Sequence, residues 1–241
     1  AADQDADEDS TESGDGSGPT PTRNEGCQLL SGLLLVDVPA RLVACMPLLG
    51  FEARKDAMRL FKDLLRYGQL LGASVPLVNY FSSHRTMAEL LLEGSGSAVV
   101  FAYCNEMLRD FTRYPELVGV LLEMGAWRRL IDLARHEHFE ISTEAFATLR
   151  EVLLVNKEVV VEQIMPVFDA FFEHFHLRLL APETDYVVKR QAAKLLADIL
   201  LDRAFAEVMV SYVAEDQYLP IHMNSLLDTS RSIQLGAFHI F

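Results

Sequence analysis

The chain contains a repeat of 41 to 47 residues, and this repeat constrains its fold more than any other feature. Counted from five starting points, each copy has a small residue at position +6 and apolar residues at +2 and +10. These positions share one face of a helix, and a small residue there lets a neighbouring helix approach closely. The starting points are Phe51, Ala98, Phe139, Tyr186 and Arg231. The small residues at +6 are Ala57, Cys104, Ala145, Ala192 and Ala237.

Helix-forming residues dominate after Gly26, and Pro or Gly interrupts them at short intervals. No segment alternates apolar and polar residues in the way that a half-buried strand does. A helical repeat of about 40–47 residues is typical of HEAT and armadillo proteins, whose units stack because none can bury its apolar face alone. We therefore predict an all-α, armadillo/HEAT-like helical-repeat superhelix, or α-solenoid, over residues 27–241. The alternative is a helical bundle with accidental self-similarity.

Residues 1–26 differ from the rest of the chain and are predicted to form a disordered acidic tail. The first 25 residues hold eight acids and one base, and so carry half of the net charge of -14. They contain no large apolar residue, so they cannot bury enough surface to offset the entropy lost on ordering. The chain stops at Phe241 within an apolar helical pattern. We therefore expect a repeat domain that is truncated at its C-terminus.

The overall composition excludes several classes of protein. The net charge of -14 argues against a general nucleic-acid binder, because such proteins need a basic surface. No apolar run reaches the ~18 residues of a membrane span. The three cysteines lack CxxC spacing, which favours free thiols in a reducing compartment. We therefore predict a cytoplasmic protein.

A search for catalytic and metal-binding patterns finds no convincing candidate. The pairs His136/His138 and His174/His176 are spaced i, i+2, which points the two side chains to different sides of a helix. The chain has no HExxH motif, phosphate-binding loop or nucleophile elbow. We therefore predict that the protein is not an enzyme and binds no metal or cofactor.

The helix face opposite the repeated small residue carries bases and aromatic residues. Offsets 0, +4, +7 and +11 point roughly away from +6, and three of the five residues at offset 0 are aromatic. A solvated helix face is the plain alternative, but aromatic residues and Arg are enriched in binding hot spots. Because the chain is acidic overall, we expect a protein partner for this surface. The bases at +11, interpreted as a basic stripe, are Lys62, Arg109 and Arg150.

Four segments resemble the calcium-binding protein 39 family, also called the mouse protein 25 scaffolds. They are 51–56 (FEARKD), 139–149 (FEISTEAFATL), 186–203 (YVVKRQAAKLLADILLDR) and 230–241 (SRSIQLGAFHIF). The resemblance runs from about Leu29 to the C-terminus, and the last two strings are highly specific to the family. It implies a non-catalytic armadillo-like scaffold that lacks the family's first helices and last repeats.

The resemblance also implies a class of partner. Members of the family bind the pseudokinase STRAD, or related sterile-twenty-like kinases, on a concave surface. They hold the partner in a closed, active-like conformation and help to assemble active liver kinase B. A separate pocket receives the C-terminal Trp-Glu-Phe tail of the pseudokinase. The expected role here is therefore a scaffold that binds a protein kinase or pseudokinase, within a complex that includes a liver kinase B-like kinase.

The resemblance assigns roles to six positions of this chain. The family's concave kinase-contact positions match Lys55, Phe139, Tyr186 and Arg203. The positions of the tail-peptide pocket match Arg190 and Met223.

One position departs from the family pattern. An aromatic residue follows Arg203 in the family, and its place is taken here by Ala206, with Phe205 offset by one. This departure changes part of the kinase contact that the resemblance implies. The alternative function is an armadillo-type peptide or cargo adaptor that is not linked to kinases. Such adaptors present ladders of Trp and Asn, and this chain has a single Trp.

Overall fold

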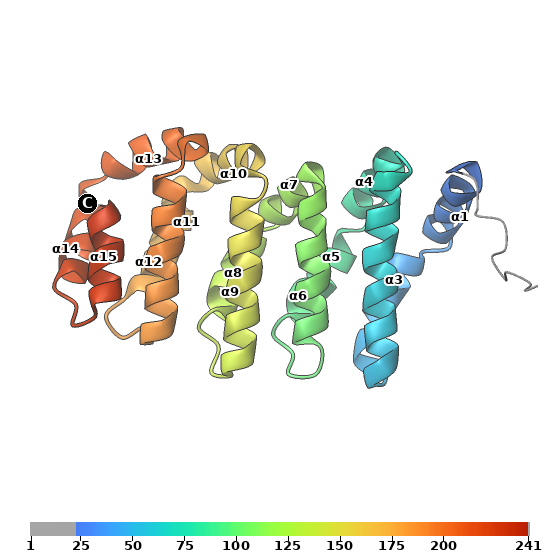
Figure 1. Cartoon of the computed structure of the whole chain (residues 1–241), viewed down its shortest axis with the longest axis horizontal. Coiled ribbons are helices and arrows are strands. Elements are labelled where there is room, and N and C mark those ends of the chain that lie inside the picture. The colour runs from blue at the N-terminus through green and yellow to red at the C-terminus, as the bar shows by residue number, and fades with distance from the viewer. Residues whose placement is uncertain (1–22, 241) are drawn as a thin grey trace, which may run out of the picture.

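The computed structural model describes residues 23–240, and every regular element in that range is a helix. The α-helices form five successive groups of three. The third helices of the groups stand beside one another in a row across Figure 1, from α3 at one end to α15 at the other. The predicted all-α, armadillo-like helical-repeat architecture is confirmed. The third helices are α3 (Phe51–Leu70), α6 (Phe101–Asp110), α9 (Phe139–Leu154), α12 (Tyr186–Leu200) and α15 (Arg231–Ile240).

Several of the first and second helices lie behind this row in Figure 1, while α1 lies beyond α3 at one end and α14 beside α15 at the other. The first helices are α1 (Arg23–Leu35), α4 (Ser74–Ser83), α7 (Pro115–Glu123), α10 (Lys157–Ile164) and α13 (Ala206–Val213). The second helices are α2 (Val38–Cys45), α5 (Arg85–Gly94), α8 (Ala126–Leu133), α11 (Phe168–Phe175) and α14 (Leu219–Leu226). The short 3-10 helices are η1 (Met46–Leu48), η2 (Phe111–Arg113), η3 (Met165–Val167), η5 (Arg203–Phe205) and η6 (Asp216–Tyr218), and η4 (His176–Leu180) is a π-helix.

The repeat read from the sequence matches the third helices closely. Four of them begin at the predicted starting point, and α6 begins three residues after Ala98. All five small residues at +6 are buried, and so are the described residues at +10. Position +2 is buried in four groups, but Ala53 is exposed on α3, which stands at the end of the row.

The small residues permit tight packing between helices. A Cβ added at Gly94 of α5 would lie only 2.4 Å from Cys104 Sγ of α6. Cys104 is the small residue at position +6 of the second copy of the repeat. A Cβ added at Gly236 of α15 would lie 3.2 Å from Ala193 Cβ of α12. A larger side chain at these contacts would push the helices apart, so the small residues set the distance at which they pack.

Proline, glycine and aspartate residues set several helix boundaries. Pro115 opens α7, where its missing N–H would have no intrahelical partner in any case. Gly125 has a φ of 77° between α7 and α8, in the left-handed region that glycine adopts at little cost. Asp185 caps α12 by accepting a hydrogen bond from the Val187 N–H at 2.8 Å. These residues keep the connections short, so each group of three helices stays compact.

A continuous hydrophobic core runs along the repeat domain. Near its centre, Trp127 is 4% exposed and contacts the edge of the Phe171 ring, with 5.2 Å between the ring centroids. Within residues 23–240, no single helix is long and apolar enough to cross a membrane. The segments 23–35 and 38–48, which meet at a bend of 54°, satisfy the length and composition criteria only as a pair.

The first helix begins earlier than the sequence predicts. Residues 23–26, which the sequence assigns to the acidic tail, form the first turn of α1. Arg23 Nε donates a hydrogen bond to the Leu71 carbonyl at 2.9 Å, and a Cβ added at Gly26 would lie 3.1 Å from Leu71 Cδ1. These contacts hold the turn against the end of α3. The rest of the predicted tail, residues 1–22, lies outside the described residues.

Candidate protein-binding face

The N-terminal ends of the third helices lie along one edge of the row in Figure 1. Three of these helices begin with an exposed aromatic residue, because Phe51, Phe139 and Tyr186 are 61%, 65% and 47% exposed. Position +4, one turn later, presents polar or basic side chains in the same groups. We call the residues at these two positions the rim. The rim comprises Phe51, Lys55, Phe139, Thr143, Tyr186 and Arg190.

The first group supplies an aromatic–cation pair to the rim. Lys55 Nζ lies 4.0 Å from the centroid of the Phe51 ring. The same ammonium group forms an ion pair with Glu52 Oε1 at 3.3 Å. The spacing i, i+4 places the base directly above the ring on the helix surface. A partner would therefore meet a flat apolar surface with a positive charge at its edge.

The fourth group has an aromatic and a basic residue, Tyr186 and Arg190, at the same spacing of i, i+4. The Tyr186 hydroxyl accepts a hydrogen bond from Ser230 Oγ at 3.4 Å, and Ser230 directly precedes α15. Hydrogen bonds with Ser230 and Ser232, and then the nearby Arg190 guanidinium, lower the pKa of the Tyr186 hydroxyl from its ordinary value. The phenol ring is therefore oriented by the fifth group, while Arg190 remains exposed.

A cleft with a volume of about 510 Å³ opens beside the rim, between α9 and α12. Phe139 and Thr143 contribute to its wall from α9, and Val187 and Gln191 contribute from α12. Because Phe139 is largely exposed, its ring stands beside a recess that has both apolar and polar walls. The rim is therefore hollowed at its third group, where a partner side chain could enter.

Arg203 does not lie with the other predicted kinase contacts. It follows the C-terminal end of α12, a helix of 15 residues, so it is about 22 Å along the axis from Tyr186. Phe205 is only 1% exposed and belongs to the core, whereas Ala206 is exposed. Neither position 205 nor position 206 therefore provides the exposed aromatic side chain that the family pattern places after Arg203.

The two predicted tail-pocket residues lie on helices of different groups. Arg190 belongs to the rim on α12, and Met223 lies on α14, where it is 52% exposed. Both side chains are exposed to solvent. The structure thus places them on neighbouring groups, with Met223 on a second helix rather than in the row of third helices.

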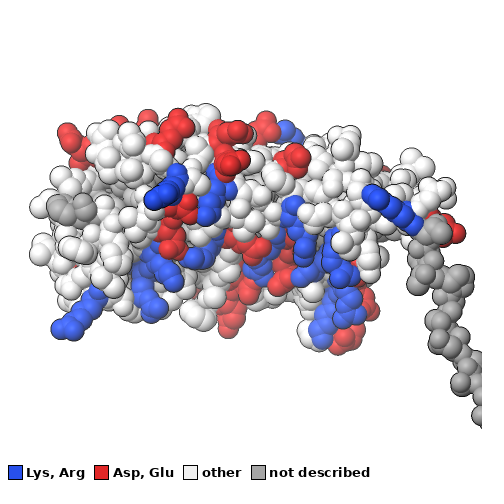
Figure 2. Space-filling model, turned by 45° about the horizontal axis from the view of Figure 1, so that its top comes forward, with Lys and Arg blue, Asp and Glu red and all other residues white. Residues whose placement is uncertain are grey.

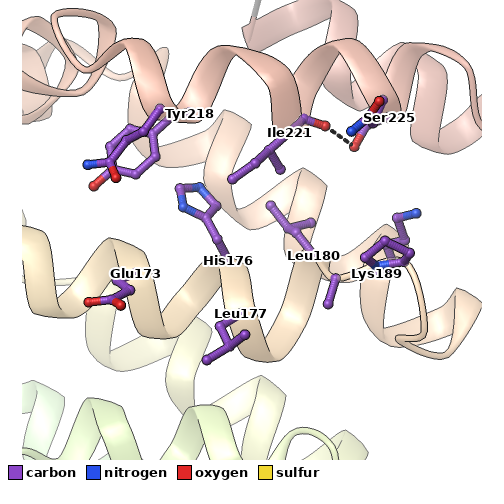
Figure 3. A pocket seen from close by; sticks show the side chains of 12 residues that line it. Glu173, His176, Leu177, Leu180, Lys189, Tyr218, Ile221 and Ser225 are labelled. Atoms are coloured by element: carbon purple, nitrogen blue, oxygen red, sulfur yellow. Dashed lines mark hydrogen bonds between the residues drawn. The ribbon is translucent and has the colours of Figure 1, made fainter.

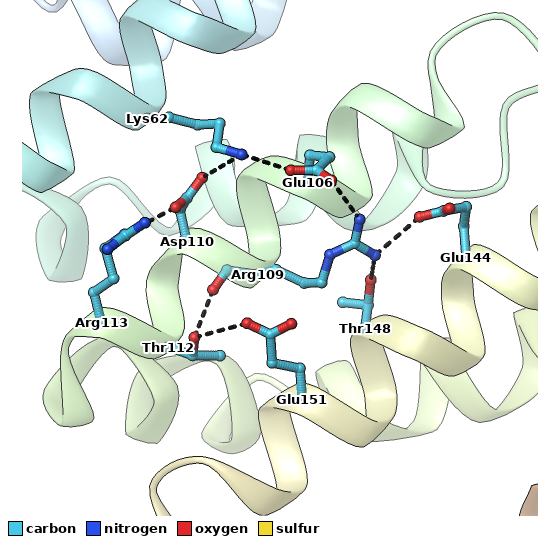
Figure 4. Close-up of polar contacts among 9 residues, drawn as sticks. All are labelled: Lys62, Glu106, Arg109, Asp110, Thr112, Arg113, Glu144, Thr148 and Glu151. Carbon is cyan, nitrogen blue, oxygen red and sulfur yellow. Dashed lines mark hydrogen bonds and ion pairs between the residues drawn. The ribbon is translucent and has the colours of Figure 1, made fainter.

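The bases of the predicted basic stripe form ion pairs instead of a free positive surface (Figure 4). Lys62 Nζ lies 2.6 Å from Glu106 Oε2 and 3.7 Å from Asp110 Oδ2, and so links α3 to α6. Arg109 lies 2.9 Å from both Glu106 Oε1 and Glu144 Oε2, and so links α6 to α9. We call these five residues the ion ladder. They tie three successive groups together.

The pKa values of the ion ladder reflect these contacts. Burial disfavours the charge on Lys62, but its hydrogen bond to Glu106 and the charge of Asp110 outweigh burial and raise its pKa. The hydrogen bond from Lys62 lowers the pKa of Glu106. Burial also disfavours the charge on Arg109, yet Glu144 and Glu106 raise its pKa. All three groups are therefore charged at neutral pH.

Arg150 continues the pattern, because its guanidinium lies 2.7 Å from Asp198 Oδ2 of α12. Every base of the predicted stripe is thus paired with a carboxylate of the following group, and Figure 2 shows Lys and Arg interspersed with Asp and Glu. The interpretation as a basic stripe needs this correction. The sequence contains part of the signal, because an acid at +12 of the next copy pairs with two of the three bases. These pairs are Lys62 with Asp110 and Arg150 with Asp198, whereas Arg109 pairs with Glu144 at +5.

Position +7 also differs from the expectation that it points away from the core. Asn105, Phe146 and Ala193 occupy this position and are 0%, 5% and 4% exposed. A helix within a stack is covered by its own group and by its neighbours, so less than half of its surface remains open. The exposed face of the third helices is therefore narrower than a single-helix projection predicts.

The described residues include no arrangement that would hold a metal ion. Between 23 and 240, no group of three or more His, Cys, Asp and Glu side chains is suitably placed. The cysteines Cys27, Cys45 and Cys104 are free thiols, and burial raises the pKa of Cys104 to about 12.

Known proteins resemble this chain in sequence and in fold. A calcium-binding protein 39-like protein of Mus musculus is 34% identical over 211 residues, which cover 88% of this chain and 60% of that protein. An Mo25-like protein of Schizosaccharomyces pombe is 34% identical over 85% of this chain and 61% of its own length. A crystal structure of an engineered protein aligns with a TM-score of 0.50 at 17% identity, covering 90% of this chain and 87% of that one.

These relatives are longer than the chain, which spans about 60% of their length. The family profile described as Mo25-like matches residues 10–241, which includes all five groups of helices. The four segments that resemble the calcium-binding protein 39 family lie within this match. The chain therefore belongs to the Mo25-like family.

Proposed function

We propose that the protein is a non-catalytic scaffold that binds a protein kinase or pseudokinase and stabilises its active conformation. The rim supports this proposal most directly. It exposes three aromatic rings, and two of them have a basic residue one helical turn away. Aromatic residues and bases of this kind supply much of the binding energy in protein interfaces.

The way in which the rim is supported fits a binding surface. Its residues stand on helices that are tied together by the ion ladder and by the Arg150–Asp198 pair. A rigid surface loses little conformational entropy when a partner binds, so more of the contact energy appears as affinity. From Lys55 on α3 to Arg203 beyond α12, the candidate contacts span four groups of helices, which suits a folded domain as the partner.

Activation would follow from a difference in affinity between two states of the kinase. A scaffold that binds the closed kinase more tightly than the open kinase shifts the equilibrium toward the closed state by that difference. No catalytic group of the scaffold is needed for this effect. The partner we propose is STRAD-like or sterile-twenty-like, in a complex with a liver kinase B-like kinase, and the three free thiols suit a reducing cytoplasm.

An activity assay tests the proposal. The purified chain is titrated into a sterile-twenty-like kinase, binding is followed by co-purification, and phosphorylation of a model substrate is measured at saturation. We expect activity to rise with scaffold concentration and then to reach a plateau. If the kinase binds but its activity stays flat at saturation, the activation mechanism is wrong.

Charge reversal tests where the kinase binds. Lys55→Glu and Arg203→Glu should each weaken binding by about tenfold, because each replaces an attractive charge at the interface with a repulsive one. Arg128→Glu is the matched control, since Arg128 is exposed on the second helix α8 and away from the rim. If Lys55→Glu binds as tightly as the control, the rim is not the kinase-binding surface. If Arg203→Glu binds as tightly as the control, the interface does not extend to the C-terminal end of α12. An array of extended peptides tests the alternative role as a peptide adaptor.

A further inference from the structure

The first group of helices differs in charge from the four groups that follow it. Residues 23–72, which form this group, hold seven bases and five acids, whereas residues 73–241 hold 14 bases and 23 acids. Residues 1–22, which we call the acidic segment, hold seven acids and no base. The acidic segment is therefore joined directly to the one group, of the five described, in which bases outnumber acids.

The far end of the row shows the contrast. Figure 3 shows the junction between the fourth and fifth groups, where Glu173 and Lys189 both line a pocket of about 330 Å³. Lys189 Nζ lies 3.0 Å from Asp228 Oδ2, so the positive charge at this pocket is neutralised. The carboxylate of Glu173 is exposed. A surface of this kind repels an acidic segment.

The exposed bases of the first group are concentrated on α3. Lys55, Arg59 and Arg66 follow one another at spacings of four and seven residues, which places them on one side of the helix. Their side chains are 42%, 73% and 50% exposed, and each forms an ion pair with an acid three residues earlier on α3. Exposed pairs of this kind contribute only about 0–1 kcal/mol. These bases can therefore exchange their partners for other carboxylates at little cost.

Arg54 adds a positive charge beside Lys55. Its guanidinium donates hydrogen bonds to the Met46 carbonyl at 3.1 Å and to the Pro47 carbonyl at 3.2 Å. Within residues 23–240, no carboxylate forms an ion pair with it. Peptide carbonyls carry no net charge, so the charge of Arg54 is not neutralised. The N-terminal half of α3 therefore has an excess of positive charge.

The point of attachment lets the acidic segment reach these bases. The segment joins α1 at Arg23, whose Nε donates a hydrogen bond to the Leu71 carbonyl at the end of α3. Along the helix axis, Arg59 lies about 18 Å from Leu71 and Lys55 about 24 Å. The acids lie 8 to 20 residues before Arg23, and a random coil of that length spans about 15–25 Å. The acids and the bases therefore fall in the same range of distance.

We propose that the acidic segment binds the basic side of α3, in an intramolecular contact centred on Arg54, Lys55 and Arg59. Covalent attachment holds the acids near α3 at an effective concentration in the millimolar range, so weak ion pairs suffice. The segment has no large apolar residue, so the contact is electrostatic and salt screens it. Because Lys55 belongs to the rim, a partner that binds there must displace the segment. That consequence rests on the proposed function, whereas the contact itself does not.

Cross-linking of the full chain with a carbodiimide tests the contact without a kinase. The reagent joins a carboxylate to a lysine amine only where the two groups touch. Lys194 of α12 is the matched control for Lys55, because it is an exposed lysine on a third helix of a net-acidic group. We expect the acidic segment to be joined to Lys55 about fivefold more often than to Lys194, and 1 M salt to abolish the excess. Equal yields at the two lysines at low salt would overturn the proposal.

Two variants of the full chain test whether charge carries the contact. One neutralises all seven acids of the segment, and the control keeps the seven acids in a shuffled order. Both leave the helices unchanged, so both should fold. We expect the NMR amide signals of residues 54–59 to shift in the neutralised variant and to stay as in the parent in the control. Unchanged signals in both variants would overturn the proposal. The seven changes are Asp3→Asn, Asp5→Asn, Asp7→Asn, Glu8→Gln, Asp9→Asn, Glu12→Gln and Asp15→Asn.

Discussion

Two regions of the same row of helices use different polar connections. The first three groups are joined at their surface by the charged residues of the ion ladder. The fourth and fifth groups are joined in the interior by the neutral chain of His176, Tyr212 and His222, and also by an ion pair between Lys189 and Asp228. Both regions bury a small residue at +6, so the helix packing is alike while the electrostatics differ. Ionic strength should therefore act more strongly on the first region, which several ion pairs connect, and moderate acid on the second.

The largest expected difference between the regions appears when the pH is lowered. Burial lowers the pKa of His176 to about 3 and that of His222 to about 4, from an ordinary value of 6.5. The unfolded chain takes up these protons near pH 6.5 and the folded chain does not, so stability is full above that pH and falls toward pH 4. The loss amounts to at most about 1.4 kcal/mol per pH unit for each histidine.

The ion ladder responds at lower pH than the histidines. The hydrogen bond from Lys62 lowers the pKa of Glu106 below its ordinary 4.5, so its stabilisation is present above pH 4.5 and is lost only below it. Hydrogen exchange measured at successive pH values should therefore show α11 and α13 losing protection before α6. If α6 loses protection at the same pH as α13, the proposed division between the regions is wrong.

Tyr212→Phe should give the next largest effect. It removes the hydroxyl that hydrogen-bonds to Nε2 of both His176 and His222. Each buried nitrogen that is left without a partner costs about 1–3 kcal/mol of stability. We expect the free energy of unfolding to fall by about 2–3 kcal/mol in urea denaturation, independently of salt. Tyr67→Phe is the control, because Tyr67 is 49% exposed and its substitution should have little effect. Similar losses for the two variants would show that the buried chain contributes no specific stability.

Arg109→Gln should give a smaller loss that depends on salt. Its side chain is 16% exposed and contacts Glu106 and Glu144, so the ion pairs are partly shielded from water. We expect a loss of about 1 kcal/mol at low ionic strength, which shrinks at 1 M salt because the remaining charges are screened. Urea denaturation at both salt concentrations measures the change. A loss that stays the same in 1 M salt would mean that Arg109 acts by packing alone.

The sequence predicted the row of third helices well because the signal is local. Apolar residues and one small residue recur on the same face, and four helices begin at the predicted position. The start of α1 was missed because Arg23 and Gly26 are held by contacts with Leu71, 48 and 45 residues away in the chain. Composition cannot register a contact of that kind.

The candidate site was predicted in part. Phe139, Tyr186 and Arg190 lie on the rim as exposed residues and Lys55 is half-buried there, which agrees with the opposite-face argument at offsets 0 and +4. The argument failed at +11, because pairing between groups depends on how helices are offset when they stack. A single-helix projection contains no information on that offset. The pairs of Lys62 with Asp110 and of Arg150 with Asp198 become visible only when neighbouring copies of the repeat are compared.

The most direct test of the central claim is hydrogen–deuterium exchange of the chain with and without a saturating sterile-twenty-like kinase. The claim is that the rim is the protein-binding surface. We predict slower exchange in the first turns of α3, α9 and α12, where the rim residues lie, and unchanged exchange in the second helices α8 and α11. Protection confined to α8 and α11, with the rim unchanged at saturation, would contradict the account.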